Sequence, residues 1–154
     1  GVKPDQFLRF FGIIADTVKE LLGTDWSDDV GAAWKRVLGD LDRIVSRAGL
    51  AMGVIDAMAN IITGVMQMDP NWGETRVGLK RRRTIVTGFR RMEADPPSYA
   101  GGVPDLSTIT TVVAVDYLRL RFKDAPWVEP IPRLDALRDA VAARPAFETT
   151  KPYV

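Results

Sequence analysis

The sequence contains neither cysteine nor histidine among its 154 residues. Without cysteine the chain has no disulfide bond and no thiol nucleophile. Without histidine it has no imidazole for acid–base catalysis and lacks the commonest haem ligand, and the two absences together exclude the usual zinc sites. We therefore expect no catalytic residue, no metal site and no cofactor.

An excess of charge of one sign is also missing, because 21 basic residues face 20 acidic ones and the formal net charge is +1. No overall field then directs the protein to nucleic acid or to a membrane surface. We expect no apolar run long enough to cross a bilayer and no signal peptide at the start of the chain. We expect a single helical domain over residues 1–154 and a cytoplasmic or recombinant setting.

Apolar residues recur every three or four positions over most of the chain, which is the pattern of amphipathic helices. The pattern predicts a first helix over Pro4–Leu22, closed by Gly23, and a long second helix over Asp28–Met68 with Ser27 as its cap. The first helix directs inward the side chains of Phe7, Phe11, Ile14, Val18 and Leu21.

Two further helices are predicted over residues 72–94 and 133–143, and the tail over 144–154 is expected to be extended because it carries prolines. The helix over 72–94 directs inward the side chains of Leu79, Val86, Phe89 and Met92.

The stretch from Asp105 to Arg121 is apolar or hydroxyl-bearing all the way round in its middle. Its many β-branched residues favour a buried strand by propensity. Against a strand, Asp105 and Ser107 are good helix caps, and a lone strand among helices would have no ladder partner for its backbone groups. We predict a central helix that is buried on every side, in an all-α fold of about five helices.

Five motifs over residues 47–154 resemble the all-helical C-terminal domain of bacterial glutathione transferases. They are LAMGVIDA (50–57), GFRRMEADPP (88–97), VAVDYLRLRF (113–122), APW (125–127) and AARPAFETTKP (142–152). One departure is the cap of the central helix, where the family places a hydroxyl residue first and an Asp three positions later, whereas this chain has Asp105 and then Thr108. In that family a separate thioredoxin-like domain binds glutathione, and its βαβ pattern is absent from this sequence.

Three motifs over residues 1–46 resemble the last two helices of a neuroglobin-type globin: GVKPDQF (1–7), LLG (21–23) and AAWKRVLGDL (32–41). The resemblance implies a haem-pocket role for the positions of Val2, Phe7, Phe10, Leu38 and Leu41. Ordinary core packing is the favoured interpretation of these side chains, since helix stripes of Phe and Leu are common in any core. The proximal histidine that holds haem in a globin would precede Gly1.

Met52, Ile55, Asp56 and Met58 form the candidate pocket for an apolar small molecule, because helix interfaces are common ligand sites and methionine adapts to irregular ligands. The alternative is that methionine fills gaps in the core and that Asp56 belongs to the solvated side of its helix, together with residues at helical spacing from it: Asn60, Thr63 and Gln67.

Two other polar groups have a structural interpretation that we favour. The basic run 80–83, with Arg76, Arg90 and Arg91, suits a solvated helix face better than a phosphate-binding one. Asp116 and Tyr117 are expected to need buried hydrogen-bond partners and not to be catalytic.

Two incomplete families that meet inside one helix suggest an engineered or recombined helical scaffold without activity of its own. Its hairpin over residues 4–46 would cover the apolar face that the transferase domain otherwise exposes. One alternative is a glutathione transferase-like subunit that supplies an apolar pocket for an electrophile, and another is a binding module for haem or an apolar small molecule. No partner, nucleic acid or membrane is required, and a monomer is favoured over a homodimer.

Overall fold

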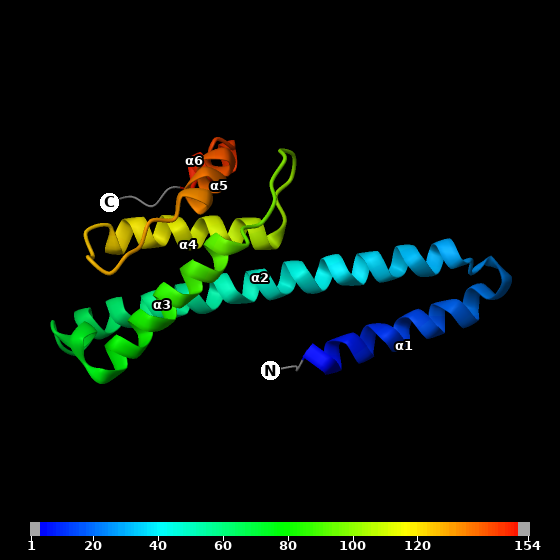
Figure 1. Ribbon diagram of the computed structural model, residues 1–154, viewed down its shortest axis with the longest axis horizontal. Helices are drawn as coiled ribbons and strands as arrows, with labels where there is room; N and C mark the ends of the chain where they lie inside the picture. The colour runs from blue at the N-terminus through cyan, green and yellow to red at the C-terminus, as the bar shows by residue number, and fades with distance from the viewer. Residues whose placement is uncertain (1–3, 151–154) are drawn as a thin grey trace. The chain divides into compact units, whose positions relative to one another are not determined.

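The computed structural model describes residues 4–150, with side chains described at Gln6 and from Arg9 onward. Over this range the chain forms helices and no strand, so the predicted all-α class is confirmed (Figure 1). The helices in chain order are α1 (Pro4–Leu22), the 3-10 helix η1 (Gly23–Asp25), α2 (Asp28–Gln67), the 3-10 helix η2 (Trp72–Glu74), α3 (Arg76–Ala94), α4 (Leu106–Phe122), α5 (Pro132–Ala142) and the short α6 (Pro145–Thr149).

The chain divides into two compact units, Gly1–Arg43 and Ile44–Val154, and each is considered by itself. The boundary falls inside α2, which therefore contributes to both units. In the first unit, Gly23 has the left-handed φ of 52° that allows the turn after α1, and the Ser27 hydroxyl accepts a hydrogen bond of 3.3 Å from the Val30 N–H. Both turn residues do what the sequence predicted.

The first unit buries little of its apolar surface. Phe11, Ile14 and Val18 are half-buried, as an amphipathic α1 requires, but Leu21 is exposed, contrary to the prediction, because it belongs to the last turn of the helix. Among the described residues up to Arg43, none is fully buried.

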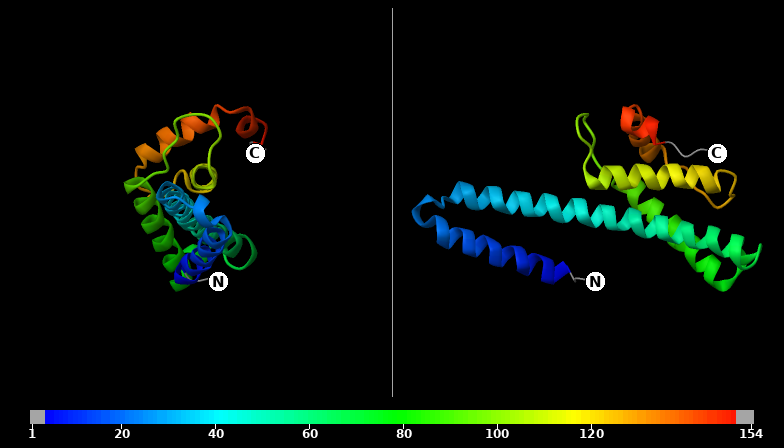
Figure 2. Two further views of the ribbon diagram at one scale, coloured as in Figure 1. Left: turned by 90° about the vertical axis from the view of Figure 1, so that its right-hand side faces the viewer. Right: turned by 180° about the vertical axis from the view of Figure 1, so that it is seen from behind.

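The second unit holds the core, with α4 at its centre. Figures 1 and 2 show α5 and α6 on one side of α4, and α3 with the later part of α2 on the other. The main cluster of buried side chains draws on four helices and one loop: Ala51, Val54, Ala57, Met58 and Ile61 of α2; Ile85, Phe89 and Met92 of α3; Ala114, Val115, Leu118 and Phe122 of α4; and Ile131 and Leu134 at the start of α5.

The predicted helix over 72–94 is interrupted near its start. η2 ends at Glu74, and α3 begins after Thr75, whose hydroxyl accepts a hydrogen bond of 3.1 Å from the Gly78 N–H. Gly78 is buried against the backbone of η2, which fixes the rotation of α3 so that Leu79 points outward. The prediction that Leu79 faces the core was therefore wrong, and Ile85 takes the inward position instead.

The described part of the segment 144–154, which ends at Thr150, is not extended as predicted. Pro145 stands in the first turn of α6, where a proline needs no hydrogen-bond acceptor and its fixed φ favours a helix. Phe147 of α6 packs against a second, smaller cluster formed by Val112, Leu137 and Val141. Pro145 thus starts a helix.

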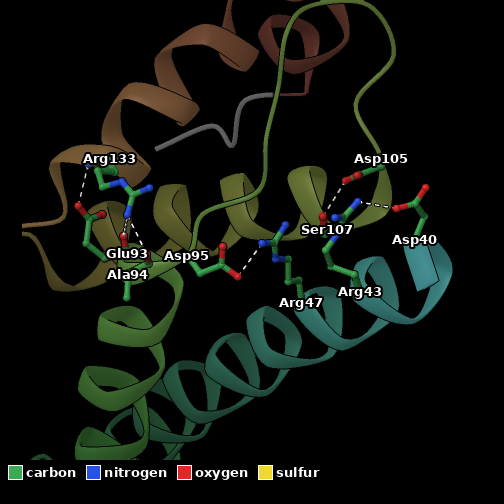
Figure 3. A network of polar contacts seen from close by, with 9 residues as sticks. All are labelled: Asp40, Arg43, Arg47, Glu93, Ala94, Asp95, Asp105, Ser107 and Arg133. Carbon is green, nitrogen blue, oxygen red and sulfur yellow. Dashed lines mark hydrogen bonds and ion pairs between the residues drawn. The ribbon is translucent and has the colours of Figure 1, made fainter. Parts of the chain in front are cut away.

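α3 and α5 cap each other (Figure 3). The Glu93 carboxylate in the last turn of α3 accepts hydrogen bonds from the backbone N–H groups of Arg133 (2.9 Å) and Leu134 (3.0 Å) at the start of α5. In return, the Arg133 guanidinium donates to the carbonyls of Glu93 (3.0 Å) and Ala94 (2.8 Å) at the end of α3. α5 has no cap of its own from Ile131, so the neighbouring helix supplies it.

The later part of α2 corrects one expectation about membranes. By length and composition alone α2 could cross a bilayer, although about 33% of its most apolar stretch is buried inside the protein. No run made of apolar residues alone is long in α2, but its most apolar stretch carries at most two charged residues. Its buried residues from Ala48 to Gly64 contribute to the core of the second unit, and core helices of soluble proteins have the same composition.

Candidate functional site

The central helix α4 is not buried on every side, which corrects the sequence prediction. Residues from Ser107 to Phe122 bury most of its circumference, as the prediction required. One side stays open, however: Leu106 is 54% exposed, Val113 43% and Ile109 37%. The composition of the helix alone did not reveal that its apolar surface exceeds what the other helices of the second unit cover.

The exposed side of α4 forms one continuous apolar line. It consists of the exposed Leu106, Ile109 and Val113 and the half-buried Tyr117 and Leu120, which together we call the α4 stripe. The spacing of three or four residues places these side chains above one another on one face of the helix. Contiguous exposed apolar surface of this kind marks interaction sites in soluble proteins.

A cavity of about 400 Å³ adjoins the α4 stripe where the helix faces α6. Val113, Tyr117 and Leu120 line it from α4, and Phe147 lines it from α6. Its polar lining groups are Asp116, Arg121 and Thr150. The cavity can hold a small molecule with a mainly apolar body, and its polar groups can orient one polar substituent.

The polar groups beside this cavity bind α4 to α5. The Asp116 carboxylate accepts a hydrogen bond of 2.7 Å from Arg138 Nε, and this bond raises the pKa of Arg138 above its ordinary value. Arg119 forms a second ion pair with Asp135. The predicted need of Asp116 for a partner is confirmed, but the carboxylate is only partly buried.

Asp105 is the N-cap of α4. Partial burial raises its pKa, but hydrogen bonds from the Thr108 N–H (2.8 Å) and the Ser107 hydroxyl (2.8 Å) outweigh this effect and hold the pKa below its ordinary value. The reversed order of the capping residues therefore still yields a cap, as Figure 3 shows for Asp105 and Ser107.

The four residues of the candidate pocket on α2 are not brought together by the structure. Met58 is fully buried in the core cluster, whereas Met52 and Asp56 are exposed and Ile55 is half-buried. Asp56 is exposed on α2 together with Thr63 and Gln67, as the alternative interpretation had it. Asn60, the fourth residue of that interpretation, is half-buried and donates a hydrogen bond of 2.8 Å to the Asp56 carbonyl. Met58 and Met52 face different sides of the helix, so they cannot line one cavity together.

The positions suggested by the globin resemblance are also dispersed. Val2 and the side chain of Phe7 lie outside the described residues, and Phe10 is exposed. Leu38 lines a cavity of about 520 Å³ in the first unit together with Trp26 and other residues, but neither Phe10 nor Leu41 does. Among the described residues no group of acidic side chains could hold a metal ion.

The basic run on α3 separates into two kinds of side chain. Arg82 pairs with Glu74, and its guanidinium lies 5.4 Å from the centre of the Trp127 ring. Arg90 pairs with Glu129. The other exposed members are Arg76, Lys80, Arg83 and Arg91. The interpretation of the run as a solvated face holds for the second group, whereas the paired arginines have structural partners that sequence reasoning missed.

No family model matches the sequence, and no curated protein matches it. Among solved structures, a glutathione transferase family member from Pseudomonas fluorescens Pf-5, with bound S-(propanoic acid)-glutathione, is similar with a TM-score of 0.59 at 24% identity, over 73% of this chain and 57% of that protein. A glutathione S-transferase from Methylobacterium radiotolerans JCM 2831, in complex with glutathione sulfonate, gives a TM-score of 0.60 at 23% identity, over 72% of this chain and 53% of that protein.

These likenesses show that the chain has a glutathione transferase-like helical fold, which confirms that part of the sequence prediction. The chain spans little more than half the length of either protein. The covered share of this chain is close to the share that lies in the second unit, Ile44–Val154. Neither protein is a globin, so the globin resemblance and a recombined origin gain no support from them.

Proposed function

We propose that residues 44–154 act as the helical half of a glutathione transferase-like enzyme. In this proposal the α4 stripe packs against a thioredoxin-like domain that binds glutathione, and the cavity beside Tyr117 holds an apolar electrophile. The observation that supports it is the uncovered apolar line on the central helix of a fold whose solved relatives are longer and were found with glutathione derivatives. Burial of such side chains stabilises an interface by about 1.5–3 kcal/mol for each residue that becomes fully buried.

The residues present determine which catalytic role each of the two domains has in this proposal. The partner domain supplies the glutathione thiolate, which attacks an electrophilic carbon, forms the carbon–sulfur bond and displaces a leaving group such as chloride. The apolar walls of the cavity exclude water from the electrophile. The Tyr117 hydroxyl and the Arg121 guanidinium provide hydrogen-bond donors for negative charge that develops on a nitro or carbonyl substituent.

The test is binding and catalysis in trans. The chain is titrated with the separately produced glutathione-binding domain of the Pseudomonas fluorescens protein, and conjugation of 1-chloro-2,4-dinitrobenzene to glutathione is followed. We expect saturable binding by calorimetry and a conjugation rate above that of either piece. Ile109→Asp should lower the affinity for the domain and the conjugation rate by about tenfold or more, the loss typical of a central interface residue.

The matched control is Val103→Lys, because Val103 is 89% exposed in the loop before α4 and lies outside the stripe. It should leave binding and rate unchanged, while circular dichroism verifies that both variants fold. If the domain does not bind, or if Val103→Lys acts like Ile109→Asp, the proposal is wrong.

A second candidate is the recombined scaffold without activity. The division of the chain between Arg43 and Ile44 favours it, since this boundary falls close to the junction at 46/47 that the two resemblances suggest. The same titration separates the two candidates, because a scaffold complete in itself binds no thioredoxin-like domain. Light scattering should then give the mass of a monomer, both for the original chain and for the Ile109→Asp variant.

A further inference from the structure

A second cavity lies in the same unit, formed by residues other than those of the α4 stripe. The loop that follows α4 folds back over α3 and encloses about 310 Å³. Its deep wall consists of Ile85, Phe89, Leu118 and Ile131, all of them buried. The proposed function does not use this cavity, so a ligand could bind in it whether or not the α4 stripe meets a partner domain.

The aromatic wall of this cavity is fixed in advance. The Trp127 ring lies 5.3 Å from the ring of Phe122, at an angle of 59°, and the Arg82 guanidinium lies 5.4 Å from the centre of Trp127. Arg82 itself is held by Glu74. Because Phe122 and Arg82 both contact the Trp127 ring, its position does not depend on a ligand. A planar ligand therefore binds against a preformed surface.

The charged side chains at the rim already have hydrogen-bond partners within the protein, and two of them, Arg90 and Glu129, form an ion pair. Arg90 Nε donates to Glu129 Oε2 at 2.6 Å, and Arg90 Nη2 forms a second bond to the other carboxylate oxygen. These bonds raise the pKa of Arg90 and lower that of Glu129, so both remain ionised at neutral pH. Also at the rim, the Glu93 carboxylate accepts hydrogen bonds through both oxygens from backbone N–H groups at the start of α5, and the Arg133 guanidinium donates to a carbonyl at the end of α3.

A cationic ligand would therefore find both rim carboxylates occupied, and an anionic ligand could reach only Arg133, whose guanidinium already donates to two carbonyls. Either charge would lose hydration on entering an apolar space. We propose that this cavity binds a small neutral aromatic molecule of one or two fused rings. Size agrees with this class, since an apolar cavity of about 150 Å³ in another protein is dry and binds benzene. The ring of Trp127 provides the stacking surface.

The test compares two dyes that share an anilinonaphthalene core: neutral N-phenyl-1-naphthylamine and its anionic sulfonate, 1-anilinonaphthalene-8-sulfonate. Fluorescence titration of the full chain should show one saturable site for the neutral dye and binding weaker by about tenfold or more for the sulfonate, because the sulfonate loses hydration on entering an apolar space. Methyl NMR spectra should place the neutral dye, with shifts at Ile85, Val86 and Ile131.

Val86→Phe fills the cavity from its half-buried wall and should weaken the neutral dye by about tenfold or more. Val77→Phe is the matched control, because Val77 lies exposed on the same helix outside the cavity. Equal affinity for the two dyes, shifts at Ile109 and Val113 in place of the cavity, or unchanged binding to the Val86→Phe variant would each overturn the assignment.

Discussion

Asp105 determines where the central helix begins. Its carboxylate accepts hydrogen bonds from the Thr108 N–H and the Ser107 hydroxyl. Both are stronger when the acceptor is ionised, which is why the pKa of Asp105 lies below its ordinary value. The cap is therefore both a stabilising contact and a group whose contribution depends on pH.

Replacing Asp105 with Ala should lower the free energy of unfolding by about 1 kcal/mol, the usual cost of a lost N-cap. Since the folded pKa is depressed, the charged cap stabilises fully above the unfolded pKa of about 3.9 and loses its effect as the pH falls through the lower folded pKa. Urea unfolding at pH 7 and at pH values below 4 measures both effects. Asp105→Asn, which caps without titrating, should remove this part of the pH dependence and keep most of the stability at pH 7.

Gly88 allows α3 to approach α2 closely. A Cβ at this position would overlap Cγ2 of Val54, a side chain that is itself buried and stiff about its first torsion. Gly49 and Gly53 have open space at the corresponding point. Sequence alone could not separate these glycines, because nothing local distinguishes a contact glycine from one that only weakens its helix.

Gly88→Ala should therefore destabilise the protein by about 1–3 kcal/mol through overpacking. Gly53→Ala should stabilise it by up to about 1 kcal/mol, because alanine is the better helix former and meets no neighbour. Chemical denaturation monitored by circular dichroism gives both values. Equal effects of the two substitutions would show that helix propensity, and not the contact with Val54, determines the change in stability at Gly88.

At the scale of whole elements, the reciprocal capping between α3 and α5 links the two helices more specifically than apolar packing does. Glu93→Ala leaves two N–H groups at the start of α5 without acceptors and should cost about 1–3 kcal/mol. A double-mutant cycle with Arg133→Ala measures the coupling between the two side chains. A coupling near zero would mean that each cap acts by itself.

The helices themselves were largely predictable from the sequence. The stretch 105–121 became a helix despite its β-branched residues, because a cap at Asp105 and neighbours on several sides decide more than propensity does. The break between η2 and α3 was not predictable, since it depends on the contact of Gly78 with the backbone of η2. α6 was missed because proline was taken as a sign of extended chain although it also favours the first turn of a helix.

At the scale of the whole molecule, burial is unevenly distributed between the two units. The buried hydrophobic residues of the described chain all lie between Ala48 and Val141, so they belong to the second unit. We predict that backbone amides of α1 exchange with deuterium much faster than those of α4, because few buried contacts oppose local opening. Hydrogen exchange resolved by NMR tests this, and equal protection of α1 and α4 would contradict it.

The candidate sites were harder to predict than the fold. The α4 stripe was visible as apolar sequence, but which of its residues stay uncovered depends on the positions of α2, α3 and α5. The cavity beside Trp127 depends on partners far apart in sequence, such as Arg90 and Glu129, whose pairing no local pattern indicates. Of the residues of the candidate pocket on α2, Met58 lies in the core and Met52 on an exposed face, a difference that the residue type alone does not indicate.

The boundary between the units falls inside a helix and not in a loop, which affects how the first unit acquires its structure. Starting an isolated helix is unfavourable by a factor of about 10⁻³, whereas adding residues to an existing one is close to neutral. The later part of α2, held by the core, is an existing nucleus from which the turns before Ile44 can propagate. A peptide of residues 28–46 should accordingly be mostly unfolded in water, although the same residues are helical in the full chain.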